Sequence, residues 1–285
     1  MASEFTDTAT RIAKVLISEV TTPAKDKTLR AKNVGGVGGG LKYACGGIFF
    51  KFCVDEYGLY GGNHWAAKAA KHELRGLALY MNYSMSCKAA GAEELCPVRF
   101  PLMCVVDWHG WRVLCSAMLP IKGSETLRYG SADGGKSIHS HPGAAAWMQQ
   151  AALALNLKPH IVTSRDLSHS ETMHACADIE LHEGSDGRFY LIDTHRVMPA
   201  QTPDGSKGAF LRNLFRPEFV KHYEKNLCSD GFSLFGMGAA TSSTYLQKHN
   251  SELRDATNKL LNETIPEFAR HCIERFPSDE DIEPR

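Results

Sequence analysis

The pattern of apolar and polar residues predicts an opening helix, followed by a β-rich stretch with one helix inserted. Apolar residues recur at helical spacing over 3–20. The run 48–54 is typical of a strand, and its phenylalanines alternate between the two faces. Residues 65–81 are strong helix formers, and Glu73 falls on or at the edge of their apolar face. The first part of the chain therefore combines strands with one long helix.

The same pattern predicts a second hairpin and then mainly helices. Two apolar runs within 101–119 are separated by a His-Gly pair, which indicates strands joined by a turn. A helix is expected around 144–155 and a short strand within 157–163. Residues 210–285 are mainly helical in pattern, and Pro266 predicts a kink or a break between two helices.

The most informative stretch is 178–196, DIELHEGSDGRFYLIDTHR, which predicts a hairpin that turns at Asp-Gly. A two-residue loop would place Glu180 opposite Asp193, and a four-residue loop would place Asp178 there instead. Like charges that face each other across two strands are unfavourable. Such a pair requires a cation, a shared proton or a basic neighbour. The alternative is a solvated hairpin whose acids face water.

These elements predict a two-lobed α+β fold with a protein-kinase-like arrangement, in which a β-rich first lobe precedes a mainly helical second lobe. The expected divisions are an N-terminal helix with a glycine-rich segment at 1–47, the first lobe with its inserted helix at 48–122, the second lobe with the 178–193 hairpin at 123–276, and an acidic tail at 277–285.

Composition narrows the classes of function. Of 285 residues, 43% are hydrophobic and 22% charged, as in ordinary globular proteins. The formal net charge of zero argues against nucleic-acid binding through global charge and leaves only a local patch for it. No secretory signal and no membrane span are expected. The nine cysteines are scattered without CxxC pairs, which favours reduced thiols and a cytoplasmic location.

The order of polar residues predicts a kinase-like nucleotide site. Such a site needs a flexible backbone over the phosphates, a strand lysine and a helix glutamate that orients the lysine. Lys51 on the expected strand would contact phosphates and pair with Glu73 on the next helix. Gly38, Gly39 and Gly40, in the glycine-rich segment before that strand, would cover the bound nucleotide.

The acids of the second hairpin complete this hypothesis. Asp193 follows a strand after a glycine-containing turn, where kinases place an aspartate that binds magnesium. Together with Glu180 or Asp178, it would hold Mg²⁺ beside ATP and neutralise the charge collision across the hairpin.

Several features depart from a typical protein kinase. The glycine stretch fits neither GxGxxGxV nor the Walker pattern. Asp166 in Ser-Arg-Asp-Leu lies 27 residues before Asp193, too far for the usual catalytic loop, so no general base is visible. The residues therefore favour an unconventional phosphotransferase or a pseudokinase. In a further alternative, the acids and Lys51 form a buried ionic network that only stabilises the fold.

Several segments, in order, resemble the CLU (clustered mitochondria) domain family. They cover most of residues 48–270: GLYGGNHWAAKAAKHELRGL, PLMCVVDWHGWRVLCSAMLPI, TLRYGSADGGKSIH, LNLKPHIV, ADIELHEGSDGRFYLIDTHRVMP, LFRPEFV and ATNKLLNETIPEFA. Members of that family are typically very large, with a ubiquitin-like region and C-terminal helical repeats. This chain resembles the CLU domain alone.

The resemblance implies a cytoplasmic protein linked to mitochondrial distribution and biogenesis. It also implies binding to mRNAs for mitochondrial proteins and association with the translation machinery. The second hypothesis is therefore a non-catalytic module that binds RNA, the ribosome or a mitochondrial-surface protein. The family supplies no defined catalytic residues, so the kinase-like site is predicted from residue order alone.

Overall fold

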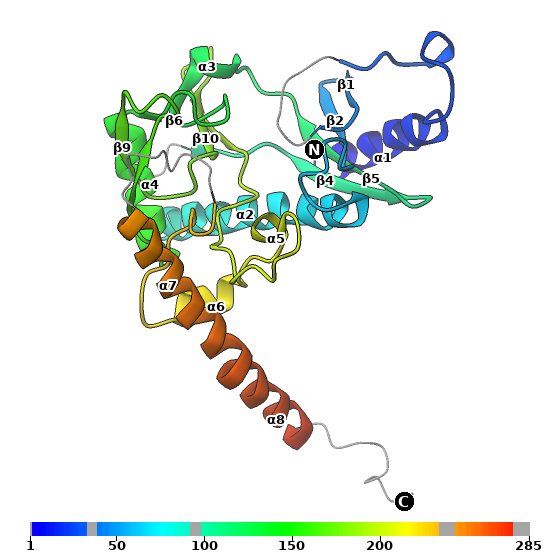
Figure 1. Cartoon of the computed structure of the whole chain (residues 1–285). Coiled ribbons are helices and arrows are strands. Elements are labelled where there is room, and N and C mark those ends of the chain that lie inside the picture. The colour runs from blue at the N-terminus through cyan, green and yellow to red at the C-terminus, as the bar shows by residue number, and fades with distance from the viewer. Residues whose placement is uncertain (1, 33–38, 92–97, 234–242, 276–285) are drawn as a thin grey trace, which may run out of the picture.

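A computed structural model describes residues 2–32, 39–91, 98–233 and 243–275 of the chain (Figure 1). The first half contains α1 (Ala2–Ser18), the 3₁₀ helix η1 (Ala24–Asp26), β1 (Lys42–Cys45), β2 (Ile48–Phe52), α2 (Asn63–Ala89), β3 (Val98–Arg99), β4 (Met103–Trp108), β5 (Trp111–Ala117), α3 (Gly123–Thr126), β6 (Leu127–Gly130) and β7 (His139–Ser140). The second half contains α4 (Pro142–Ala154), β8 (His160–Thr163), β9 (Ser170–Met173), β10 (Glu180–Glu183), β11 (Phe189–Ile192), α5 (Ala209–Arg212), α6 (Pro217–His222), α7 (Ser243–Lys259), the π-helix η3 (Leu260–Thr264) and α8 (Ile265–Arg275). The mixed α+β class is confirmed, and the kinase-like two-lobed arrangement stays a prediction.

The first sheet has the strand order β1-β2-β5-β4, and every neighbouring pair is antiparallel. Phe50 and Phe52 are buried on one of its faces, as their alternation predicted, and the apolar side of α1 packs into the same core. The predicted β4–β5 hairpin is confirmed. Its turn residues His109 and Gly110 both have positive φ, at 47° and 76°, which suits a tight connection between twisted strands.

The second sheet has the order β3-β11-β10-β6-β7, and β8 pairs with β9 beside it. β3 joins this sheet parallel to β11, although it precedes β4 and β5 of the first sheet in the chain. Strands β6, β7 and β9 were not predicted, since their short runs carry little periodicity. The larger core lies here and includes Tyr129, Trp147 and Leu191.

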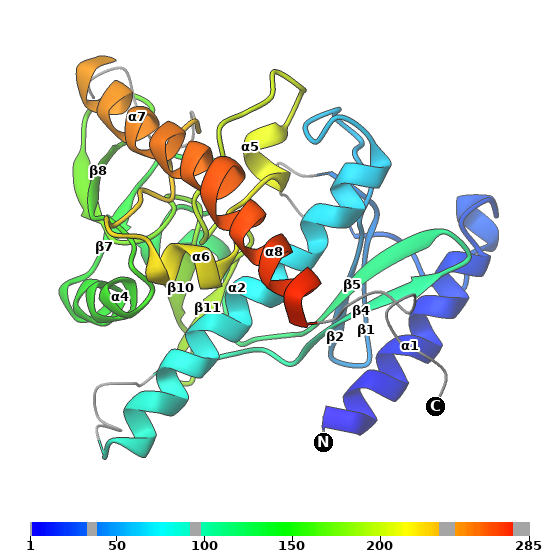
Figure 2. The same ribbon diagram turned by 90° about the horizontal axis from the view of Figure 1, so that it is seen from below.

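Helix α2 is longer than predicted and runs beneath both sheets, as Figure 2 shows in cyan. It buries Ala66 and Leu77 along one side. Gly76 lets the helix approach the segment after β11, because a Cβ atom there would lie 2.0 Å from the Thr194 carbonyl oxygen. The helix therefore brings Glu73 to the end of the second hairpin.

The hairpin of β10 and β11 has neither predicted register. Glu180 pairs with Ile192, and residues 184–188 form the loop. The Asp186 carboxylate holds this loop, because it accepts hydrogen bonds from the Tyr190 hydroxyl (2.8 Å) and the Arg188 amide (3.2 Å). Asp193 therefore follows the strand, with a left-handed φ of 56°, and does not face another carboxylate directly.

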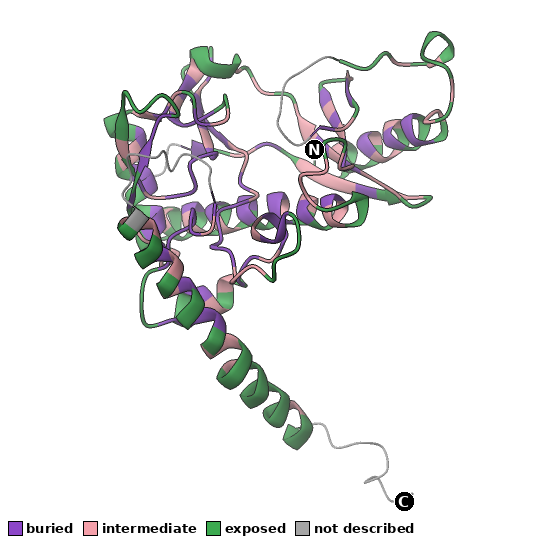
Figure 3. Ribbon diagram, viewed as in Figure 1, coloured by how far each residue is buried: buried purple, intermediate pink, exposed green. Residues whose placement is uncertain are grey.

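The C-terminal helix α8 leads away from the body of the molecule, whereas α7 lies against it (Figure 3). α7 buries Leu253 and Ala256, whereas α8 buries none of its residues. The π-helical turn η3 ends directly before the segment that contains Pro266. Because proline has no amide hydrogen to donate within a helix, a widened turn at this point fits the predicted irregularity.

Candidate functional site

A cavity of about 300 Å³ lies between the first sheet, α2 and the β10–β11 hairpin. It is lined by most of the residues that the sequence singled out: Lys51, Glu73, Asp178, Glu180 and Asp193. Among them, Lys51 lies on β2 and Asp193 follows β11. Residues that are far apart in the sequence therefore line the same cavity.

Two of the three glycines predicted to cover a nucleotide, Gly39 and Gly40, lie within the described residues. Gly40 donates its amide hydrogen to Glu56 Oε2 at 2.8 Å, and Gly39 lies against Glu56 and Tyr57. Neither glycine lines the cavity. Gly38 lies outside the described residues. A role for this segment in covering a nucleotide therefore stays a prediction.

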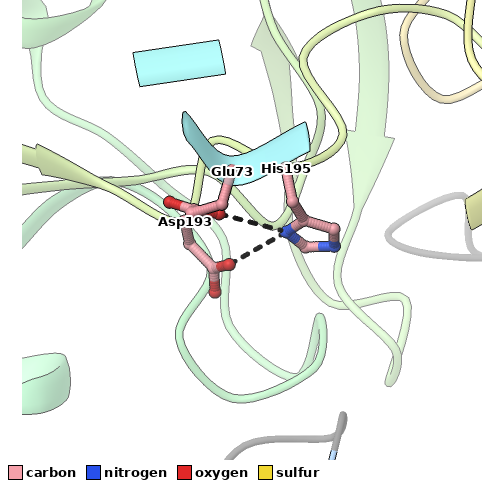
Figure 4. A group of neighbouring side chains, drawn as sticks. All are labelled: Glu73, Asp193 and His195. Atoms are coloured by element: carbon pink, nitrogen blue, oxygen red, sulfur yellow. Dashed lines mark hydrogen bonds and ion pairs between the residues drawn. The ribbon is translucent and has the colours of Figure 1, made fainter. Parts of the chain in front are cut away.

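Glu73, Asp193 and His195 form the tightest polar group in the cavity (Figure 4). One potential metal-ligating atom from each residue lies within 4.8 Å of the other two. His195 Nδ1 is 3.0 Å from Asp193 Oδ1 and 3.8 Å from Glu73 Oε2. Two carboxylates and an imidazole are a ligand set that divalent cations use.

No role was predicted for His195 from the sequence. Its position two residues after Asp193 was the available signal, but a lone histidine in a loop is common. The intervening Thr194 fixes the geometry, because its amide donates to Glu73 Oε1 at 3.0 Å and its hydroxyl donates to the Glu73 carbonyl at 2.8 Å. Thr194 thereby ties α2 to the segment that carries both Asp193 and His195.

The pKa values of both Glu73 and His195 lie above their ordinary values in this group. Burial raises the pKa of Glu73 to about 7, and the nearby Asp193 charge adds to the rise, while His195 and the Thr194 hydrogen bonds oppose it. Burial disfavours the charged form of His195, yet its hydrogen bond to Asp193 and the surrounding acids raise its pKa above the ordinary value. The imidazolium thus supplies positive charge that the acids require.

Glu180 also lines the cavity, at the start of β10. Its Oε2 atom lies 2.9 Å from His182 Nε2. Burial raises the pKa of Glu180, the His182 hydrogen bond counters this, and the Asp193 charge adds to the rise. Glu180 is therefore a carboxylate within the same electrostatic group as Asp193.

Asp178, which was predicted as a candidate metal ligand, forms an ion pair with Arg196. Its two oxygens accept hydrogen bonds from Arg196 Nε at 3.0 and 2.9 Å, and Arg196 Nη2 also bonds Asp178 at 2.6 Å and Asp230 at 2.7 Å. Burial alone would raise the pKa of Asp178, but Arg196 and His195 hold it at about 2. A basic neighbour was one of the three partners expected for these acids, and Arg196 is such a neighbour, bound to both oxygens of Asp178.

The predicted ion pair between Lys51 and Glu73 is not formed. Both side chains line the cavity, but no ion pair within the described residues joins them. The Glu73 carboxylate is turned toward Thr194 and His195. Asp178 and Glu73 therefore have partners within the second half of the chain, and Lys51 has no ion pair among the described residues.

Comparison with known proteins places the chain in a family. A family model described as "CLU: Clustered mitochondria" matches residues 1–203. The chain belongs to the clustered mitochondria family. This CLU region contains every charged residue of the cavity described above, whereas α7 and α8 lie beyond it.

Individual relatives give the same result. The chain is 30% identical to "Protein clueless" of Drosophila willistoni over 162 residues, which are 53% of this chain and 10% of that protein. It is 27% identical to a "Clustered mitochondria protein homolog" of Meyerozyma guilliermondii over 238 residues, which are 78% of this chain and 17% of that protein. A namesake from Culex quinquefasciatus is 28% identical over 206 residues, 69% of this chain and 13% of that protein.

The match spans about a tenth of the length of the Drosophila relative. No solved structure matches the chain. In the described part of the CLU chain, no helix is both long and apolar enough to cross a membrane, and the eight cysteines there are free.

Proposed function

We propose that this CLU domain binds a nucleotide together with a divalent cation in the cavity between the first sheet and the β10–β11 hairpin. The observation that supports the proposal most strongly is the close group of Glu73, Asp193 and His195 in a cavity that also contains Lys51. Magnesium favours carboxylate and phosphate oxygens, and a lysine binds the same phosphates as a point charge. The cavity thus offers both kinds of contact.

Each residue has a role that follows from its surroundings. Asp193 and Glu73, with Glu180 nearby, would supply oxygen ligands to the cation. His195 supplies positive charge between these acids, and a bound cation would take over that task and lower the pKa of the imidazole. Lys51, on the wall formed by the first sheet, would contact phosphate oxygens.

We favour nucleotide binding without phosphoryl transfer. Asp166, in the Ser-Arg-Asp-Leu sequence, is exposed, accepts hydrogen bonds from the hydroxyls of Ser164 and Ser168, and lies outside the cavity lining. Asp178 is not free to act as a base, because both of its oxygens accept hydrogen bonds from Arg196. The remaining acids in the cavity are needed for the cation, which leaves the alternative, an unconventional phosphotransferase, without an assigned base.

A second candidate function rests on the relatives. Two of these relatives are named for clustered mitochondria, and the chain corresponds to a small part of each. In this alternative the domain is a non-catalytic module within the machinery of mitochondrial distribution, and it contacts RNA, the ribosome or another protein. Such binding would not depend on magnesium and nucleotide, which separates it from the first proposal.

Calorimetric titration of ATP with Mg²⁺ into the purified protein tests the proposal. We expect binding that is lost on chelation of Mg²⁺, at least tenfold weaker in Asp193→Ala, and weaker in Lys51→Ala. Asp166→Ala removes an exposed acid outside the cavity and should bind as the native chain does. Absence of binding at millimolar ATP would refute the proposal. Formation of ADP that Asp193→Ala abolishes would favour the phosphotransferase instead.

A further inference from the structure

A second and larger cavity, of about 600 Å³, lies at the beginning of α2 and beside the β4–β5 turn. The nucleotide cavity uses Ala66, Ala69 and Glu73 of this helix, whereas the second cavity uses His64, Lys68 and Lys71. These two sets belong to different sides of α2, because residues four or three apart lie above one another on a helix. The helix therefore forms part of the wall of both cavities.

The lining of this second cavity has an excess of positive charge. Lys68, Lys71 and Arg112 contribute three cations, and Asp107 is the one acid among the residues that line it. Arg112 already binds Asp107 through Nε, at 3.1 Å, and through Nη2. No ion pair within the described residues involves Lys68 or Lys71, although Lys68 lies over the Trp65 ring. Two positive charges therefore face the cavity without an acidic partner.

Arg112 gives the cavity a fixed cation. It lies on β5, its side chain is only 17% exposed, and its Nη1 donates to the Ala67 carbonyl oxygen at 2.6 Å. This bond joins the first sheet to α2 and holds the guanidinium at the cavity. A held arginine beside two flexible lysines is a combination that recognises phosphate oxygens.

The N-terminus of α2 adds to the positive charge around the second cavity. α2 has 27 residues, begins at Asn63 and has no acidic residue in its first turn. The partial positive charge at a helix N-terminus ordinarily favours acids there. Here the basic side chains of Lys68 and Lys71 follow within the first three turns, so an external anion would relieve an unfavourable arrangement.

We propose that this second cavity binds a small phosphate-bearing molecule with two or more negative charges. Its volume is within the range of small-ligand sites, which favours a compact anion over an extended polymer. The half-buried Trp111 provides an aromatic wall for an uncharged part of the ligand. The proposal does not depend on nucleotide binding in the first cavity.

Calorimetric titration with inorganic tripolyphosphate, without divalent cation and at physiological salt, tests this site in the full chain. We expect saturable binding that weakens at least tenfold in the double variant Lys68→Ala, Lys71→Ala. The matched control is Arg75→Ala with Lys88→Ala, which removes two exposed cations from the same helix outside the cavity. This control and Asp193→Ala should both bind as the native chain does.

Three results would each overturn the proposal. The first is no binding at millimolar tripolyphosphate. The second is equal weakening in both double variants, which would mean attraction to overall charge. The third is binding of single-stranded RNA in preference to tripolyphosphate, which would assign the surface to nucleic acid. Titration of ATP with Mg²⁺ and the Asp193→Ala variant test the first cavity, whereas tripolyphosphate and the Lys68→Ala, Lys71→Ala variant test the second. Either proposal can therefore fail without the other.

Discussion

Replacing Glu73 by glutamine tests the electrostatics of the candidate site directly. Glutamine keeps the shape of the side chain and an oxygen that can accept from Thr194, but it has no charge to bury. Glu73 is buried, and its pKa rises from 4.5 to about 7 in the folded protein. The folded state therefore binds a proton more tightly than the unfolded chain does.

The sign and size of the effect follow from this difference. Between pH 4.5 and about 7 the folded protein holds more protons at Glu73 than the unfolded chain, so stability falls as pH rises through this window. Because one pKa unit corresponds to about 1.4 kcal/mol, the full loss is about 3 kcal/mol. Glu73→Gln does not suffer this loss. The variant should match the native chain near pH 4.5 and exceed its stability by about 3 kcal/mol at pH 8.

Urea unfolding of both proteins from pH 4.5 to 8, without divalent cations, measures the difference. Glu267→Gln, at an exposed position on α8, controls for the change from acid to amide. Addition of Mg²⁺ at pH 8 should stabilise the native chain and not Glu73→Gln, since a ligand stabilises only the state that binds it. A stability difference that stays constant with pH, or that grows toward acid, would refute the assigned protonation of Glu73.

Two further predictions concern the support of the site. Gly76→Ala should lower the free energy of unfolding by about 1–3 kcal/mol, because the new Cβ would collide with the Thr194 carbonyl oxygen. This loss should outweigh the higher helix propensity of alanine. An unchanged urea midpoint would contradict the close packing of α2 against this segment. Arg196→Leu should cost about 3–5 kcal/mol in the same assay, since it removes the arginine that Asp178 and Asp230 share in the buried interior. A stability equal to the native value would show that neither acid depends on Arg196.

Local pattern was sufficient for many elements of the fold. The β4–β5 hairpin, β2 and α2 were predicted because alternation, turn residues and helix formers act over a few neighbouring positions. Five strands, β1, β3, β6, β7 and β9, were missed, because each has only two to four residues. Periodicity cannot be measured over so few positions.

What the sequence determined by itself was the set of charged residues and their order along the chain: Lys51, Glu73, Glu180 and Asp193. That they line one cavity is a result of the tertiary structure. Tertiary structure alone decided their partners. Arg196 folds back onto Asp178, and Thr194 and His195 turn Glu73 away from Lys51. The interaction energy of two charges depends on their distance in space and on how much water is removed around them. Neither quantity can be derived from the spacing of residues along the chain.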